Sequence, residues 1–347
     1  MHRYSGSIIN EKRFTSGYHE NFLVPSIASD SNFFRSIMSS HFASRIWCGA
    51  GTIGENGFEV FQKVSGIGGD PISYGLERQT DHGNKPMALI RSYSDDRSVL
   101  GNNSEWTRLE VRFADPGFSF VNRYLSLAAT SSVIRLAEYS DLANIKYLLD
   151  HSFKNPLEAA KEFNTDLTFS KTALTKNGRK ISALDYQEIL ASACLELSDI
   201  IDLPQEEVNA IMQWLDICDS LRNTDLYNSE YGGLENILDL VARHYYLSRH
   251  FNTDQLNSYN VNAVSVNLSW DRILPIGGAM KYWSCNNSSE SKEKIEKLMT
   301  SPPQKTRANV RGKLISQNSN KIEDVDWSFV RLDKTIFRLD DPYVYEI

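Results

Sequence analysis

Gly49, Gly51 and Gly54 have the spacing of the G-x-G-x-x-G fingerprint, which binds the pyrophosphate of a dinucleotide. That chemistry needs a buried strand before the glycines and a helix after them, because the helix N-terminus holds the pyrophosphate. Here the order is reversed. Residues 58–63 after the glycines alternate as in a strand, and apolar residues before them recur with helical spacing, at Phe34, Ile37, Met38, Phe42 and Ile46. We therefore interpret the glycines as a helix-to-strand turn that needs unusual backbone angles.

The composition is that of a folded globular protein. Of 347 residues, 41% are hydrophobic, 11% aromatic and 23% charged, which is close to the average for globular domains. No apolar run reaches the length of a membrane span and the N-terminus lacks a signal-peptide core, so we expect a cytoplasmic protein without membrane association. The net charge of −7 disfavours a general nucleic-acid surface, although residues 307–313 form a local basic patch. Four cysteines far apart in the sequence predict free thiols.

The pattern of elements predicts an α+β fold with a mostly antiparallel sheet and helices on one side of it. Short β-rich pieces lie between residues 58 and 115, and helical spacing extends from Phe120 to about His250, with a restart at Pro156 and a hairpin turn at residues 175–180. In the first of these helices, apolar residues recur with helical spacing at Tyr124, Leu127, Ala128, Val133, Ile134 and Ala137.

A polar stretch at residues 284–294 marks a predicted domain boundary. We divide the chain into residues 1–288, a large α+β domain, and residues 289–347, a small C-terminal domain with one basic helix, a Val-Asp-Trp stretch and a strand pair.

Three segments together resemble one family. The first, SGYHENFLVPS, is similar to a Cys-His-Glu-Asn-Tyr-Leu-Val segment with Tyr18 in place of the cysteine. The second begins with the glycine turn and continues to RLEVRFADPGFSFVNRYLSLAATSSVIRLAE, and the third is SPPQKTRANVRGKLI followed by VDWSFVRLD and DPYVYEI. The family is the Pup ligase and depupylase group of the carboxylate-amine ligases, whose fold is like that of glutamine synthetase.

The resemblance implies chemistry on a glutamate side chain. Ligases of this kind transfer the γ-phosphate of ATP to the C-terminal glutamate of the small disordered protein Pup, and a lysine of a target protein then attacks the acyl phosphate. The isopeptide bond marks the target for proteasomal degradation. The implied cofactors are ATP and Mg²⁺, and the implied partners are Pup and lysine-bearing proteins. Such a site needs cations for the phosphates and an apolar or aromatic wall for the adenine.

The resemblance also implies roles for six residues. Trp327 matches a tryptophan that contacts ATP; the alternative is a core tryptophan in a strand. Arg307 and Arg311 lie four apart on an expected helix and could reach phosphates or acidic residues of Pup, or form a solvated basic face. Arg108 is expected either to face a phosphate or to form a surface salt bridge.

His19 and Glu20 are the candidate metal ligands by the same resemblance. Mg²⁺ prefers oxygen ligands, so the imidazole is the weaker candidate of the two. A turn histidine bonded to the backbone is the plainer alternative for His19.

The sequence departs from the family in two places. The family's Gly-Ile-Glu-Thr-Glu segment with metal-binding glutamates and its Asp-His-Ala-His-Pro-Glu segment with the catalytic aspartate are not in this sequence, so we assign no catalytic residue. Near Asp95 and Asp96 the family has a histidine that this sequence lacks. A chain that starts late or one that has lost activity would explain both. We expect a ligase, because VDWSFVRLD is closer to the ligase form; the alternatives are a depupylase or an inactive Pup-binding protein.

Overall fold

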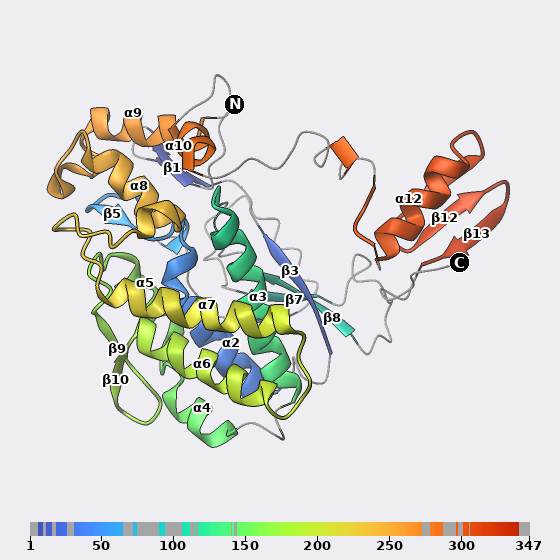
Figure 1. The fold of residues 1–347 in the computed structure, drawn as a ribbon, viewed down its shortest axis with the longest axis horizontal. Coiled ribbons are helices and arrows are strands. Elements are labelled where there is room, and N and C mark those ends of the chain that lie inside the picture. The colour runs from blue at the N-terminus through green and yellow to red at the C-terminus, as the bar shows by residue number, and fades with distance from the viewer. Residues whose placement is uncertain are drawn as a thin grey trace.

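The computed structural model describes residues 6–9, 12–15, 19–25, 31–64, 72–74, 90–93, 106–111, 115, 117–139, 141, 144–272, 278–286, 296–297, 301–304 and 306–339. It has a large body of helices packed on a sheet and a smaller C-terminal unit that stands apart from that body (Figure 1). The α+β class predicted from the sequence is confirmed.

The central sheet has four strands in the order β3-β8-β7-β6. They are β3 (Glu20–Pro25), β6 (Ile72–Tyr74), β7 (Ile90–Tyr93) and β8 (Trp106–Val111). Strand β8 pairs antiparallel with both neighbours and only β6 and β7 run parallel, so the sheet is mostly antiparallel, as predicted. Three two-stranded pairs accompany it: β1 (Gly6–Ile9) with β2 (Lys12–Thr15), β4 (Thr52–Ile53) with β5 (Phe58–Glu59), and β9 (Thr172–Leu174) with β10 (Lys180–Ser182).

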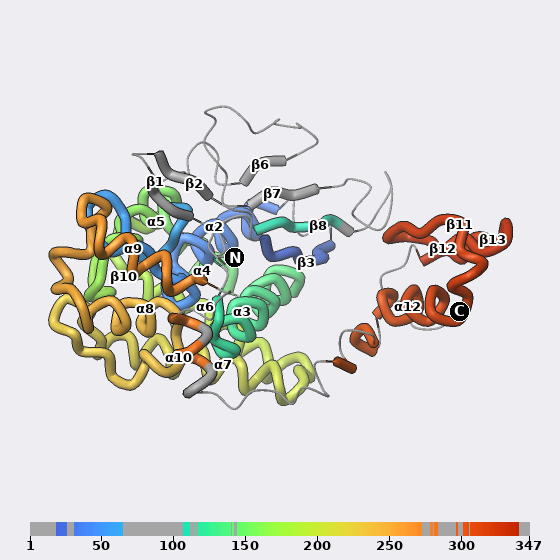
Figure 2. Tube along the Cα trace, turned by 90° about the horizontal axis from the view of Figure 1, so that it is seen from above, coloured from blue at the N-terminus to red at the C-terminus, as the bar shows by residue number. Residues whose placement is uncertain are grey.

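Helices cover one face of this sheet, with α3 directly against β3 (Figures 1 and 2). The helices of the body are α2 (Asn32–Ser44), α3 (Phe120–Glu138), α4 (Ile145–His151), α5 (Pro156–Asn164), α6 (Ala183–Ser198), α7 (Gln205–Arg222), α8 (Asp239–Ser248), α9 (Val261–Trp270) and α10 (Gly278–Asn286). Side chains of Ser31, Ser119 and Asn155 cap the N-termini of α2, α3 and α5, and Pro156 is at the first turn of α5 as expected.

Helix α2 lies in the middle of the main core. Phe34, Ile37, Met38 and Phe42 are fully buried there, which confirms the helical spacing seen in the sequence. The helix packs against α3, α5 and α6. A buried 3-10 helix, Ile46–Cys48, connects α2 to the glycine turn, so the turn is fixed to the centre of the body.

The inward side of α3 is mixed. Tyr124 and Leu127 are exposed, whereas apolar residues such as Val133 are buried together with Asn122 and Thr130, which contact Cys48 and His41. The sequence prediction for residues 58–63 is wrong in extent and in burial. The strand predicted over residues 58–63 ends at Glu59, and Phe58 through Val64 are all buried instead of alternating.

The C-terminal unit has its own core. It consists of α12 (Arg307–Gln317) and a three-stranded antiparallel sheet, β11 (Ile322–Val325), β12 (Phe329–Leu332) and β13 (Thr335–Arg338). Its buried residues are Val310, Val330, Leu332 and Leu339. The basic helix is where the sequence predicted it, and the sheet has three strands rather than two. The boundary at residue 288 stays a prediction, because residues 287–295 lie outside the described residues.

Cys48, Cys194 and Cys218 are buried free thiols, as predicted. Burial raises the pKa of Cys48 to about 12, so this thiol is inert at neutral pH. The side chain of Cys285 lies outside the described residues. In the described part of the chain, no helix is both long and apolar enough to cross a bilayer.

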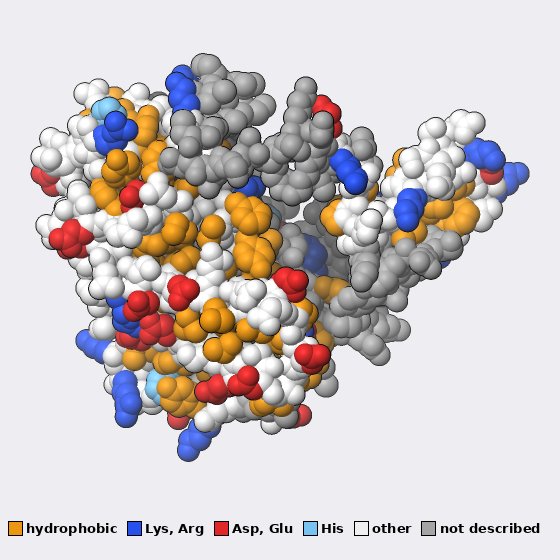
Figure 3. All heavy atoms as spheres, viewed as in Figure 1, with side chains coloured by type: hydrophobic (Ala, Val, Ile, Leu, Met, Phe, Trp, Pro, Cys, Tyr) orange, Lys and Arg blue, Asp and Glu red, His pale blue; other side chains and the backbone are white. Residues whose placement is uncertain are grey.

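Negative charge is concentrated in the α6–α7 hairpin. Residues 183–222 contain nine Asp and Glu residues and one basic residue, Arg222, which gives a net charge of −8, so the rest of the chain sums to +1. In Figure 3 the acidic side chains lie among hydrophobic ones over the part of the face that α6 and α7 form.

The buried His244 makes the stability of the body depend on pH. Burial lowers the pKa of His244 from its ordinary value of 6.5 to about 4. The imidazole lies between Phe58, Tyr231 and Thr253, with its Nδ1 atom 3.2 Å from the Tyr231 hydroxyl. Between pH 4 and 6.5 the unfolded chain therefore binds more protons than the folded chain, and stability falls as the pH falls through this range.

We expect the free energy of unfolding to be lower at pH 5 than at pH 7 by about 2 kcal/mol from His244 alone. Urea unfolding of wild type and His244→Gln at both pH values measures this contribution, and the pH 5 to pH 7 difference should be smaller in the variant by about that amount. His250→Gln, which removes an exposed imidazole, is the control and should keep the wild-type difference. An unchanged pH dependence in His244→Gln would contradict the prediction.

Candidate functional site

The central sheet has one face toward the helices and one polar face. Side chains alternate along a strand, so Glu20, Phe22 and Val24 of β3 point to the helices while Asn21 points the other way. The register places Asn21 beside Glu110 of β8. We call the side with Asn21, Arg108 and Glu110 the polar face.

Four of the side chains on or beside this face form a connected polar group. His19 lies just before β3, and its Nδ1 atom is 2.9 Å from a carboxylate oxygen of Glu110. Arg108 donates a hydrogen bond of 2.7 Å to the Asn21 side chain and lies 3.7 Å from Glu110. The structure thus brings the predicted residues His19 and Arg108 together through Glu110. Strand β7 pairs with β8 on the other side, with Arg91 in register with Glu110.

Glu20 lies on the opposite face of the sheet from His19. Its carboxylate accepts a 2.8 Å hydrogen bond from Arg45, and the two side chains are 3% and 0% exposed. Arg45 also donates to Thr130, whose hydroxyl lies 3.1 Å from the buried His41. Burial, with a smaller contribution from the nearby Arg45 charge, lowers the pKa of His41 well below its usual range.

The structure therefore does not bring the two predicted metal ligands together. Glu20 is the counter-ion of a buried arginine, which leaves His19 with Glu110 on the polar face. Two donors do not make a Mg²⁺ site, and the described residues contain no group of three or more carboxylate, imidazole or thiol side chains suited to a metal ion. The residues present do not by themselves fit the ion, and we assign it no step.

Trp327 lies in the turn between β11 and β12, not in a strand. Its side chain is 56% exposed, so the alternative of a core tryptophan is wrong. The Arg311 guanidinium lies 5.3 Å from the centre of the indole ring and donates to the Trp327 carbonyl oxygen at 3.1 Å. Arg307, one turn earlier in α12, donates to the Leu339 carbonyl oxygen at 3.3 Å. Trp327 and Arg311 therefore form one exposed cationic and aromatic surface, and Arg307 ties α12 to the end of the sheet.

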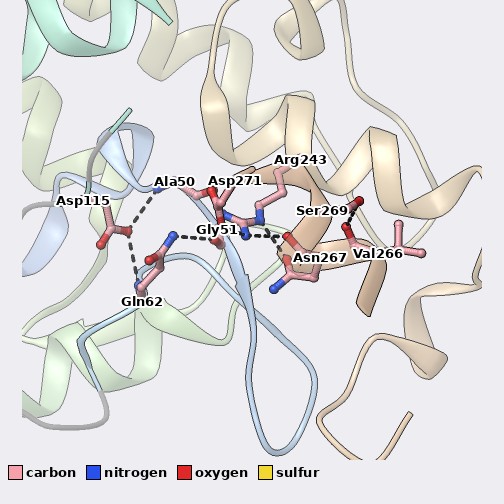
Figure 4. Close-up of polar contacts among 9 residues, drawn as sticks. All are labelled: Ala50, Gly51, Gln62, Asp115, Arg243, Val266, Asn267, Ser269 and Asp271. Carbon is pink, nitrogen blue, oxygen red and sulfur yellow. Dashed lines mark hydrogen bonds and ion pairs between the residues drawn. The ribbon is translucent and has the colours of Figure 1, made fainter. Parts of the chain in front are cut away.

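The glycine turn uses its amide groups within the protein (Figure 4). Ala50 N–H donates to the Asp115 carboxylate, which also accepts from Gln62 N–H. Gly51 N–H donates to the carbonyl oxygen of Val60, the residue after β5. The amides that a pyrophosphate would need already have partners. Gly51 has φ +69°, so the turn interpretation is confirmed at this residue.

Sequence reasoning missed Glu110 and Arg45. Glu110 follows Arg108 by two residues on a strand, so alternation alone puts both on one face and could have found it. No local signal pairs Arg45 with Glu20, which precedes it by 25 residues. Asp95 and Asp96 lie outside the described residues.

The sequence matches the model of one protein family, described as Pup-ligase protein, over residues 10–331. Among similar proteins is the Pup–protein ligase of Acidimicrobium ferrooxidans, 24% identical over 345 residues, which are 95% of this chain and 70% of that protein. The Pup–protein ligase of Mycolicibacterium smegmatis is 22% identical over 330 residues, 91% of this chain and 68% of that protein.

Two solved structures share the fold. One is the Pup ligase PafA in complex with ADP, with a TM-score of 0.80 and 17% identity over 100% of this chain and 75% of that chain. The other is the complex between Pup and PafA, with a TM-score of 0.76 and 18% identity over 99% of this chain and 69% of that chain.

Proposed function

The chain belongs to the Pup-ligase protein family, and on that premise we propose that it joins the C-terminal glutamate of Pup to lysine side chains of target proteins in an ATP-dependent reaction. The observation that carries the proposal is the family match over nearly the whole chain. The relatives reported above are named as ligases, which supports ligation over removal of Pup. Marking of the targets for proteasomal degradation belongs to the same proposal.

Arg108 is the residue we propose for the phosphates. Transfer of a phosphoryl group is catalysed mainly by positioning and by fixed positive charge. Asn21 and Glu110 orient the Arg108 guanidinium on the polar face, so its charge is held in place before a ligand arrives. The role of His19 as a metal ligand stays a prediction, with Glu110 rather than Glu20 beside it.

Trp327 is the residue we propose for the adenine. Arg311 covers one side of the indole, and the exposure of the remainder supports stacking of a purine on the other side. The Arg311 charge behind the ring would also attract the anionic nucleotide. Arg307 lies one helical turn before Arg311 and could add positive charge for the nucleotide. Its hydrogen bond to the Leu339 carbonyl oxygen favours a mainly structural role.

Replacing Trp327 with alanine is expected to weaken nucleotide binding by about 1–3 kcal/mol, the range for one stacked base. Because the side chain is exposed, the free energy of unfolding should change by less than about 1 kcal/mol. Calorimetric titration with ADP, next to thermal unfolding, measures both quantities. Tyr227→Ala removes an aromatic ring of 57% exposure from the body and should leave ADP affinity unchanged. A stable Trp327→Ala protein with wild-type affinity would contradict the assignment.

The reaction itself is tested by incubating the protein with ATP, Mg²⁺, Pup ending in glutamate and a lysine-bearing target. A covalent conjugate of Pup and target supports the proposal. Release of Pup from a purified conjugate would instead show a depupylase, and Pup binding with neither reaction would show a protein that binds Pup without catalysis. The cytoplasmic location stays a prediction.

A further inference from the structure

A groove of about 580 Å³ runs along the outer side of α6. Seven α6 residues and Ile200 just beyond the helix line it, at alternating steps of three and one from Asp185 onward. This spacing forms one continuous stripe on a helix. Fifteen residues separate Asp185 from Ile200, so the stripe is about 22 Å long at 1.5 Å per residue. The groove therefore has the length of about four helical turns.

The groove has a mixed lining, with apolar side chains on both of its sides. Leu197 and Ala193 of α6 lie at its floor, and Leu148 and Tyr147 of α4 form the opposite side. Tyr147 and Ile200 are large hydrophobic side chains that remain exposed, with Ile200 at 58%. The small residues Ser192 and Ala193 in the middle of the stripe allow a second helix to approach closely. An elongated groove with apolar side chains on both sides and a charged rim is a form that can bind one face of an amphipathic helix.

The charge of the rim determines which helix fits. Asp185, Glu188 and Glu196 line the groove, and only Arg222 brings positive charge to the hairpin that carries them. Arg222 binds Asp185 and Glu188 at one end, at 2.8 and 2.6 Å. Glu196, at the other end, has no basic residue among the groove-lining residues, so the rim carries an excess of negative charge that favours a cationic partner.

We propose that this groove binds a cationic amphipathic helix of a partner protein, about four turns long. The apolar side of that helix packs on Leu197, Ile200 and Tyr147. Its Lys and Arg side chains lie along the rim formed by Glu188 and Glu196. The groove is lined by α3, α4 and α6, on the side of the sheet away from the polar face, so this binding is separate from the proposed ligase reaction.

The test uses a fluorescein-labelled 15-residue peptide of leucine and lysine with helical spacing, and fluorescence anisotropy with the full chain at two salt concentrations. Saturable binding that weakens with salt is expected. Glu196→Lys reverses a charge in the groove and Ser192→Trp fills its middle, and each should raise the dissociation constant about tenfold or more. Both residues are exposed, so these variants should fold.

Matched variants on α7 distinguish peptide binding in the groove from attraction by the overall negative charge of the hairpin. Asp216→Lys makes the same charge change and Gln213→Trp adds the same ring on an exposed helix surface outside the groove. Each should change binding by less than about threefold. Equal losses in the α6 and α7 variants, equal binding of a leucine and glutamate peptide, or an absence of saturable binding would each overturn the proposal.

Discussion

Replacing Arg45 with methionine is expected to lower the free energy of unfolding by about 3–5 kcal/mol. The reason is that the Glu20 carboxylate, 3% exposed, would keep its charge in the core without the guanidinium that now lies 2.8 Å away. The same substitution removes the hydrogen bond from Arg45 to Thr130, which joins the C-terminal end of α2 to α3. Urea unfolding at pH 7 measures the loss.

The double variant Arg45→Met with Glu20→Met tests whether the loss of stability comes from the unpaired charge of Glu20 or from the lost contacts of Arg45. Removing both charged groups leaves no uncompensated ion, so the double variant should regain most of the stability that the single variant loses. Arg222→Met is the control, because Arg222 also binds two carboxylates but is 37% exposed on its side chain and should cost about 1 kcal/mol or less. Equal losses for Arg45→Met and Arg222→Met would contradict this account. A stable fold that needs Glu20 as a counter-ion would also explain why this residue is not available to a metal.

Replacing Gly49 with alanine is expected to destabilise the body by at least about 3 kcal/mol. The backbone at Gly49 has φ −65° and ψ 150°, which any residue adopts, so the cost is purely steric. An added Cβ atom would lie 2.4 Å from the Val60 carbonyl oxygen and 2.8 Å from its Cγ1 atom. Val60 is itself buried in the main core and cannot move without disturbing α5, whose Asn164 carbonyl accepts from Val60 N–H.

Gly178→Ala is the matched control for this glycine. Gly178 has φ +85° with open space around it, so alanine there costs only the backbone strain, about 1–2 kcal/mol. Thermal unfolding and ADP titration of both variants test the assignment together. If Gly49→Ala unfolded no more readily than Gly178→Ala but bound ADP less tightly, the glycines would serve the nucleotide rather than the packing.

Helices whose signals lie in consecutive residues were predicted correctly from the sequence. Helical spacing found α2 and Pro156 marked the start of α5, because both are properties of consecutive residues. The sequence did not reveal the whole inward side of α3, because buried polar residues such as Asn122 and Thr130 form hydrogen bonds with distant segments, and an apolar pattern does not record them. The same reason hides the Glu20–Arg45 pair.

Two kinds of information in the sequence predicted parts of the candidate site: the family resemblance and the alternation of side chains along a strand. The resemblance selected Arg108, His19 and Trp327, and the structure gives the first two a common partner in Glu110. Adjacent residues of an extended segment point to opposite sides, so His19 and Glu20 were a poor choice as joint ligands. Once a strand over residues 20–25 is accepted, that follows from the sequence alone.

The contact of Arg243 with the Ala50 carbonyl oxygen joins residues 193 positions apart, and it completes the buried surroundings of the glycine turn. During synthesis at about 5–20 residues per second, the ribosome needs roughly 10–40 s to proceed from Ala50 to Arg243 across those 193 residues. For most of that time Trp47 lacks its final partners, because Gln187 of α6 and Trp214 of α7 have not yet been synthesised. The C-terminal unit is different, because α12 and its three strands lie within residues 307–338 and can pair as soon as they emerge. The nascent chain is therefore most exposed to misassociation in its first two hundred residues and least in its last forty.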